Sequence, residues 1–183
     1  MRMPMPRCGL TNYAGSMSKL FEIQEAVARG VAEALDIEVT PSEQRALKAR
    51  PIPDLRAYEC YLRARVEYGR FTRAGAVQAL EYVRQGLAVV GESALLTSGL
   101  GHAHFVLAHT IPGTMREQLA EAETHAKRAL ALHPELVGAR TLTGLIHWKQ
   151  QRIAPALREW TAALVLDPRM PTRWVGPLMG TRR

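Results

Sequence analysis

The sequence has few cysteines and no long apolar run, and each shortage argues against a class of protein. Only Cys8 and Cys60 occur among the 183 residues, and they form no CxxC pair. This argues against a disulfide framework or a cysteine-based zinc site. No apolar stretch reaches the about 18 residues of a membrane span, and the basic start, MRMPMPR, is not followed by the apolar segment of a secretion signal. We expect a cytoplasmic protein or, alternatively, the soluble part of a membrane-anchored regulator.

The short motifs of common enzyme active sites are also missing. There is no glycine-rich dinucleotide or phosphate loop and no G-x-S-x-G motif. Neither His102 with His104 nor His104 with His109 has the i, i+4 spacing and acidic neighbour of a metal-binding helix. Glu123 and Lys127 are expected to form an ordinary ion pair on a solvated helix face. We therefore predict no enzyme activity, no metal site and no cofactor.

Positive charge is concentrated near the two ends of the chain. The formal net charge is +7, of which residues 1–15 contribute two arginines without an acidic residue. Residues 137–183 hold eight basic and two acidic residues, and the segments between are nearly neutral. A nucleic-acid-binding protein usually carries a basic face through the fold. We interpret the C-terminal excess as solvated charge, with nucleic-acid binding as an alternative.

Small and apolar residues recur after 34 residues. ALALHP at 129–134 is matched by ALVLDP at 163–168, so Pro134 aligns with Pro168. The steps of three and four residues between the small positions are those of one helix face. Each proline is expected to end its helix, because it lacks an N–H and disfavours helical geometry in the residue before it. The aligned small and apolar positions are Ala122 with Ala156, Ala126 with Trp160 and Ala129 with Ala163.

A second helical segment precedes each of these helices. In the last unit Gly144 lies twelve residues before Ala156, and we expect Gly144, Ala156 and Ala163 to mark close contact between two helices. In the middle unit the interval from Gly101 to Ala122 is nine residues longer and contains TIPGTM, which predicts an inserted loop. In the first unit Ala64 takes the glycine position and Gly91 the proline position.

This layout resembles the tetratricopeptide repeat (TPR), whose pattern W-x2-L-G-x2-Y…A-x3-F…P has the same period. In the last unit Arg140, Thr143 and His147 replace the Trp, Leu and Tyr, and His104 takes the Tyr position in the middle unit. The resemblance implies an all-α fold, a right-handed α-solenoid of antiparallel helix pairs with about three TPR units and N-terminal capping helices. Residues 19–68 also resemble the segment that opens the repeats in bacterial multidomain regulators. Those regulators include class III nucleotide cyclases, TolB-like proteins, winged-helix regulators and Ser/Thr kinases.

These patterns divide the chain into six segments. They are a disordered or artificial N-terminus at 1–17, capping helices at 18–50, TPR-like unit 1 at 54–92, unit 2 with the inserted loop at 93–135, unit 3 at 136–169 and a truncated start of a fourth unit at 170–183. Within the capping segment Leu20–Leu35 has the spacing of an amphipathic helix. We interpret it as a cap on the solenoid; docking onto a partner domain is the alternative.

In the TPR family the first helix of each pair lines a concave surface, and this places the expected binding residues. They are Tyr58, Tyr61, Arg65 and Tyr68 in unit 1, Ser98, His102 and Phe105 in unit 2, and Thr141, Leu145, Trp148 and Lys149 in unit 3. Rigid aromatic side chains with a few cations suit a peptide ligand. Several of these residues belong equally well to the core between repeats. The only asparagine is Asn12, so the Lys-, Arg- and Asn-based clamp for a chaperone tail is not expected.

From these features we predict a non-catalytic scaffold that binds a peptide or protein segment in the concave face. One alternative is a regulatory C-terminal module of a bacterial signalling protein, such as a nucleotide cyclase, a kinase or a transcriptional regulator. A second is a helical-repeat nucleic-acid binder. We also expect self-association through an apolar C-terminal end, because Pro177 stops the helix that Trp174 begins.

Overall fold

The structure, a computed structural model, describes residues 26, 27, 30 and 52–168. Over 52–168 the chain is all-helical and contains no strand, which confirms the all-α part of the predicted fold class. The helices are α3 (Leu55–Gly69), α4 (Arg73–Val90), α5 (Ala94–Thr110), α6 (Met115–Leu132), α7 (Val137–Lys149) and α8 (Ile153–Leu166). Residues 26, 27 and 30 are also helical. The predicted segments 1–17 and 170–183 and the rest of the capping segment lie outside the described residues.

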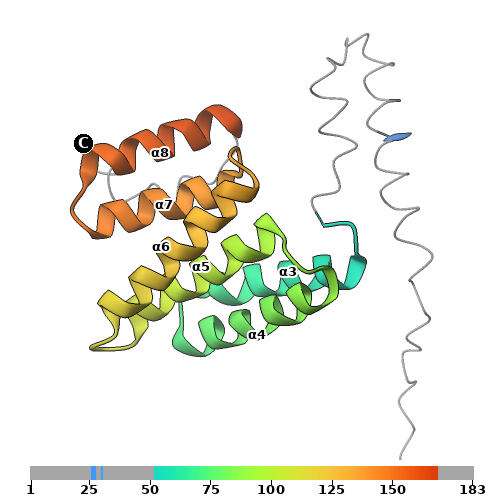
Figure 1. Cartoon of the computed structure of the whole chain (residues 1–183), viewed down its shortest axis with the longest axis horizontal. Helices are drawn as coiled ribbons and strands as arrows, with labels where there is room; N and C mark the ends of the chain where they lie inside the picture. Colours follow the sequence, from blue (N-terminus) through green and yellow to red (C-terminus); the bar gives the residue numbers. More distant parts are fainter. Residues whose placement is uncertain (1–25, 28–29, 31–51, 169–183) are drawn as a thin grey trace, which may run out of the picture. The chain divides into compact units, whose positions relative to one another are not determined.

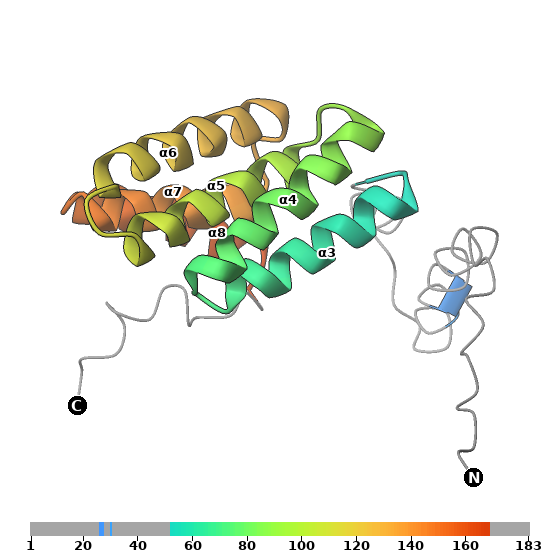
Figure 2. The same ribbon diagram turned by 90° about the horizontal axis from the view of Figure 1, so that it is seen from below.

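Helices that follow each other in the chain pack together, and α5 also packs against α3 and α7. Figure 1 shows this succession from teal α3 to red α8, and Figure 2 shows it from below. Helix α5 contains no charged residue and is buried on nearly all sides, as expected for a helix that is apolar all round. Its Val106 belongs to the core shared with α3 and α4, while Phe105 belongs to the core shared with α6, α7 and α8. None of the helices α3 to α8 is both long and apolar enough to cross a membrane.

The 34-residue period of the sequence reappears in the helix ends. Helix α6 ends at Leu132 and α8 ends at Leu166. The residues that follow are both extended, His133 with φ −146° and ψ 93° and Asp167 with φ −139° and ψ 93°. Each precedes a proline, whose ring disfavours the helical region for its predecessor. The predicted helix ends are therefore confirmed at both positions.

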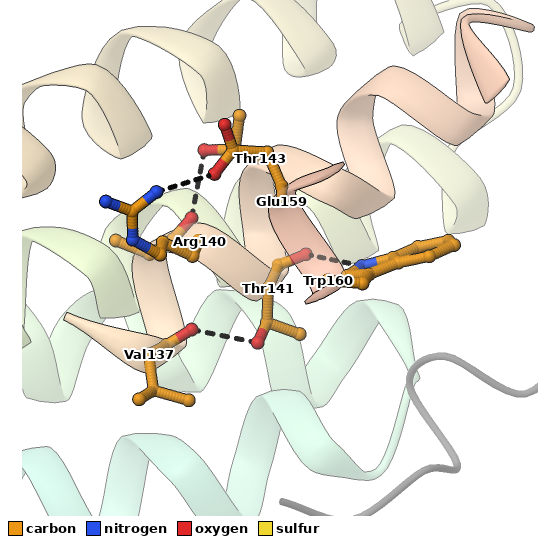
Figure 3. A network of polar contacts seen from close by, with 7 residues as sticks. Val137, Arg140, Thr141, Thr143, Glu159 and Trp160 are labelled. Carbon is orange, nitrogen blue, oxygen red and sulfur yellow. Dashed lines mark hydrogen bonds and ion pairs between the residues drawn. The ribbon is translucent and has the colours of Figure 1, made fainter. Parts of the chain in front are cut away.

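Small residues allow α7 and α8 to lie close together. A Cβ atom at Gly144 would lie only 2.3 Å from Nε1 of Trp160, and Ala156 and Ala163 are fully buried. The buried indole N–H of Trp160 donates to the backbone oxygen of Thr141 at 3.3 Å, as Figure 3 shows. This satisfies the one polar group that the tryptophan brings into the core. The close approach predicted from the small residues is confirmed.

A polar contact between the same two helices lies beside the tryptophan. Nη1 of Arg140 lies 3.2 Å from Oε2 of Glu159, and both side chains are about three-quarters buried (Figure 3). Arg140 occupies the position that is tryptophan in the TPR pattern. The ion pair therefore joins the helices at a point where that pattern has an apolar residue.

The nine additional residues of the middle unit lie mostly in its helices. Helices α5 and α6 contain 17 and 18 residues, whereas α7 and α8 contain 13 and 14. The loop between α5 and α6 covers 111–114, one residue more than the loop 150–152 between α7 and α8. The structure thus differs from the expected inserted loop: α5 is four residues longer after Gly101, and α6 is four residues longer before Ala122. Each helix gains about one turn at the end that meets the loop.

The first unit ends without a proline. Gly91 is the C-cap of α4, with φ +71°, and its N–H donates to the backbone oxygen of Leu87. A glycine tolerates this positive φ at little cost because it has no Cβ. Ala64, at the glycine position of the unit, is fully buried. Gly91 therefore ends the unit by backbone conformation, where the later units use proline.

Candidate functional site

Aromatic and imidazole rings of α3, α5 and the loop after α3 form two groups of contacts. The Tyr68 and His102 rings stack at 5.0 Å with an interplanar angle of 16°. His109 contacts Phe105 at 4.5 Å and Phe71 at 5.6 Å between ring centroids. We refer to Tyr58, Tyr61, Arg65, Tyr68, Phe71, His102, Phe105 and His109 as the ring cluster.

Helix α3 also contributes two further tyrosines and a cation to the ring cluster. The rings of Tyr58 and Tyr61 lie 6.2 Å apart, and Cζ of Arg65 lies 5.9 Å from the centre of the Tyr61 ring. Burial raises the pKa of Tyr61, and Arg65 opposes that change. The guanidinium of Arg65 is exposed, so its charge faces solvent beside an aromatic surface.

Both histidines of the ring cluster are held in a defined tautomer. Nδ1 of His102 lies 2.9 Å from the backbone oxygen of Ser98, and Nδ1 of His109 lies 2.8 Å from that of Phe105. A carbonyl only accepts, so each Nδ1 carries the proton and each Nε2 keeps its lone pair. Burial lowers the pKa of His102 to about 4, and burial together with Lys149 lowers the pKa of His109. At neutral pH both rings are therefore uncharged.

The eleven residues predicted to bind a ligand divide into two groups by exposure. Tyr68, Ser98, Phe105, Thr141 and Leu145 are buried and pack in the core. Tyr58, Tyr61, His102, Trp148 and Lys149 are half-buried, and Arg65 is exposed. Trp148 packs against the core of α5 to α8, and Lys149 is close enough to lower the pKa of His109. Of the predicted residues, the second group retains surface that a ligand can contact.

The structure adds Phe71 and His109, which sequence reasoning missed. Phe71 is 42% exposed and lies in the loop after α3 with φ +55°, where no helix periodicity could place it. His109 continues the spacing of Ser98, His102 and Phe105 by one further step of four. The signal for His109 was therefore present, since the predicted helical segment LLTSGLGHAHFVLAH ends on this residue.

A second cluster, between α5 and α6, contains groups that can hold a metal ion. His104 on α5 and Glu121 and His125 on α6 each offer one ligand atom, and these atoms lie within 4.8 Å of one another. The imidazole rings of His104 and His125 stack at 5.5 Å with an interplanar angle of 16°. Histidine spacing along one helix, on which the predicted absence of a metal site was based, cannot reveal a pair that two packed helices bring together.

Comparison with family models and with curated proteins finds no match to this chain.

Proposed function

We propose that residues 52–168 are a TPR-type scaffold that binds a peptide segment through the ring cluster. In this proposal α3–α4, α5–α6 and α7–α8 are antiparallel helix pairs of a right-handed solenoid, and α3, α5 and α7 form its binding face. The 34-residue separation of the α6 and α8 ends supports a repeat architecture. The contacts of α5 with α3 and α7 support a face built from the first helix of each pair.

The observation that carries the binding proposal is the pair of ring contacts that join α3 and the loop after it to α5, Tyr68 with His102 and Phe71 with His109. A monomeric helical protein has little structural need for a partly exposed row of tyrosine, phenylalanine and uncharged histidine rings, whereas such rings anchor peptide side chains with little loss of entropy. Arg65 lies beside the Tyr61 ring, and Lys149 lies near His109. The face therefore suits a peptide that combines apolar side chains with an acidic group.

A peptide-display selection tests this function without requiring a known partner. The purified chain is expected to enrich peptides with apolar and acidic residues, and the affinity of each enriched peptide is then measured by calorimetry. Tyr61→Ala, in the ring cluster, and Trp148→Ala, on the α7 part of the proposed binding face, should each weaken binding about tenfold or more, as expected for aromatic anchors of an interface. Tyr82→Ala is the matched control, because Tyr82 is a half-buried tyrosine on α4, outside the ring cluster.

Two outcomes contradict the proposal. One is a selection that enriches no peptide over background. The other is a set of enriched peptides whose affinity Tyr61→Ala and Trp148→Ala leave unchanged while both variants remain folded. A steep fall of affinity with salt for single-stranded nucleic acid would instead favour the nucleic-acid alternative.

A further inference from the structure

The sequence of α5 and α6 brings three potential metal ligands together. Glu121 and His125 are one turn apart on α6, so both project from the same side of that helix. Gly101 lies one turn before His104 on α5. A Cβ atom there would lie 2.5 Å from Cδ2 of Leu142 on α7, and also 3.2 Å from the backbone oxygen of Ala122 and 3.3 Å from Cβ of His125. The missing side chain at Gly101 therefore lets α6 approach α5 closely enough for the two imidazoles to meet.

Hydrogen bonding prepares His104 for coordination. Its Nδ1 lies 2.8 Å from Oε1 of Gln118, one turn before Glu121 on α6. An amide oxygen only accepts, so Nδ1 carries the proton and Nε2 keeps a lone pair. Most metal-binding histidines are oriented in this way by an acceptor on their other nitrogen. Gln118 belongs to the turn by which α6 is longer than α8.

We propose that His104, Glu121 and His125 form a binding site for a divalent transition metal ion, with zinc as the best fit. Two imidazoles and one carboxylate match the borderline softness of Zn²⁺, and three protein ligands leave a fourth position open. This site is independent of peptide binding by the ring cluster.

The distances are compatible with closure around an ion. Ligand atoms of a tetrahedral zinc site lie about 3.4 Å apart, given metal–ligand bonds of about 2.1 Å. The present atoms lie within 4.8 Å of one another, and Nε2 of His125 lies 4.0 Å from Oε2 of Glu121. The Glu121 side chain is 54% exposed and is free to turn toward the histidines. Rotation of this side chain, with a small adjustment of the rings, brings the three groups to bonding distance.

A bound ion would link α5 to α6 beyond their apolar contacts. It would therefore stabilise the longest helix pair of the described structure.

Metal titration of the full chain tests the site. The protein is treated with a chelator, dialysed and titrated with ZnCl₂ in a calorimeter, and with CoCl₂ in an absorption spectrometer. We expect one ion per chain, cobalt bands of tetrahedral intensity and no thiolate charge-transfer band in the near ultraviolet. The thermal unfolding midpoint should rise with zinc, because the ion binds only the folded state.

Variants identify the ligands. His104→Gln and His125→Gln should each weaken zinc binding about a hundredfold or more, and Gln118→Ala about tenfold, because it removes only the orienting acceptor. The matched controls are His133→Gln, on the exposed C-cap of α6, and Glu117→Gln, exposed on the same helix; both should bind as the wild type does. Circular dichroism without metal verifies that every variant is folded.

The proposal is overturned if the wild type shows no saturable binding of one ion. It is equally overturned if both His variants, folded, keep the wild-type affinity. A thiolate charge-transfer band would assign the ion to Cys8 or Cys60 and also reject the site.

Discussion

The indole of Trp160 fills the space that a side chain at Gly144 would need. The two residues belong to different helices, so the glycine sets how closely α7 and α8 approach. The tryptophan in turn depends on that approach, because its N–H reaches the backbone oxygen of Thr141 only across a close contact.

Gly144→Ala should therefore destabilise the protein, although alanine favours a helix. We expect a net loss of about 1–3 kcal/mol, because overpacking outweighs a gain in helix propensity of about 1 kcal/mol. Gly138→Ala, on the same helix, is the control: its Cβ would meet only Oγ of Ser98 at 3.6 Å, an ordinary contact. Urea unfolding of both variants measures the difference. Equal stability of the two variants would show that the contact at Gly144 has little energetic weight.

Thr72→Ala should remove an N-cap. The Thr72 hydroxyl accepts a hydrogen bond from the backbone N–H of Gly75 at 3.1 Å, and losing such a cap costs about 1 kcal/mol. Ser93 occupies the same position before α5 but makes no capping bond, and its hydroxyl is buried without a hydrogen-bond partner. Ser93→Ala should therefore leave the free energy of unfolding unchanged or raise it. A loss of similar size in both variants would contradict the assignment of the cap.

Gln151→Gly should stabilise the protein. Gln151 has φ +61°, and a residue with a side chain pays about 1–2 kcal/mol for left-handed geometry, which glycine avoids. Part of this gain is lost to the greater freedom of glycine in the unfolded chain, so we expect a net gain of up to about 1 kcal/mol. Gln150→Gly, where φ is −82°, lacks the gain and should destabilise. Thermal unfolding of the pair gives the comparison, and a stabilised Gln150→Gly would count against this explanation.

Acidification should weaken the fold through His102. Its pKa is lowered to about 4 in the folded state by burial, against 6.5 when exposed, while its bond to Ser98 opposes the change and Arg65 adds to it. Between these values the unfolded state binds more protons, so stability is complete above about pH 6.5 and falls as the pH decreases toward 4. The full difference amounts to about 3 kcal/mol. Urea unfolding across this range should give a flatter pH profile for His102→Gln than for the wild type.

The exposed His133 provides the control for this experiment. His133→Gln should keep the wild-type pH profile. If His102→Gln keeps it too, other histidines with lowered pKa values, such as His125, account for the acid sensitivity.

The sequence predicted the helical fold well where the pattern was local. The alignment of Pro134 with Pro168 located two helix ends, because the constraint that proline places on its neighbour acts within one peptide unit. The close helix contact at Gly144 could be predicted because a glycine inside a helical segment, twelve residues before an alanine of the next helix, has few explanations other than close packing. TIPGTM also located the loop between α5 and α6 correctly, but the expectation that the nine additional residues form that loop was wrong, because turn residues do not say how far the flanking helices extend.

The candidate sites were harder to predict because they depend on contacts between helices. The resemblance to the TPR family suggested which helices carry the binding residues, but it could not separate buried Phe105 from exposed Arg65. His104 and His125 are twenty-one residues apart in sequence, and their rings meet only because α5 packs on α6. The prediction that the repeats belong to a larger signalling protein stays a prediction.

The extra turns of α5 and α6 have a consequence for how such a protein can change in evolution. Four added residues rotate a helix by about 400°, so side chains beyond the insertion return to within about 40° of their former direction. A helix pair can therefore grow by whole turns at the loop that joins its helices while its neighbours keep their contacts, whereas an insertion of two residues would turn the apolar face outward. The loop end of a pair such as α5 and α6 is thus where new chemistry can be acquired without rebuilding the other helices.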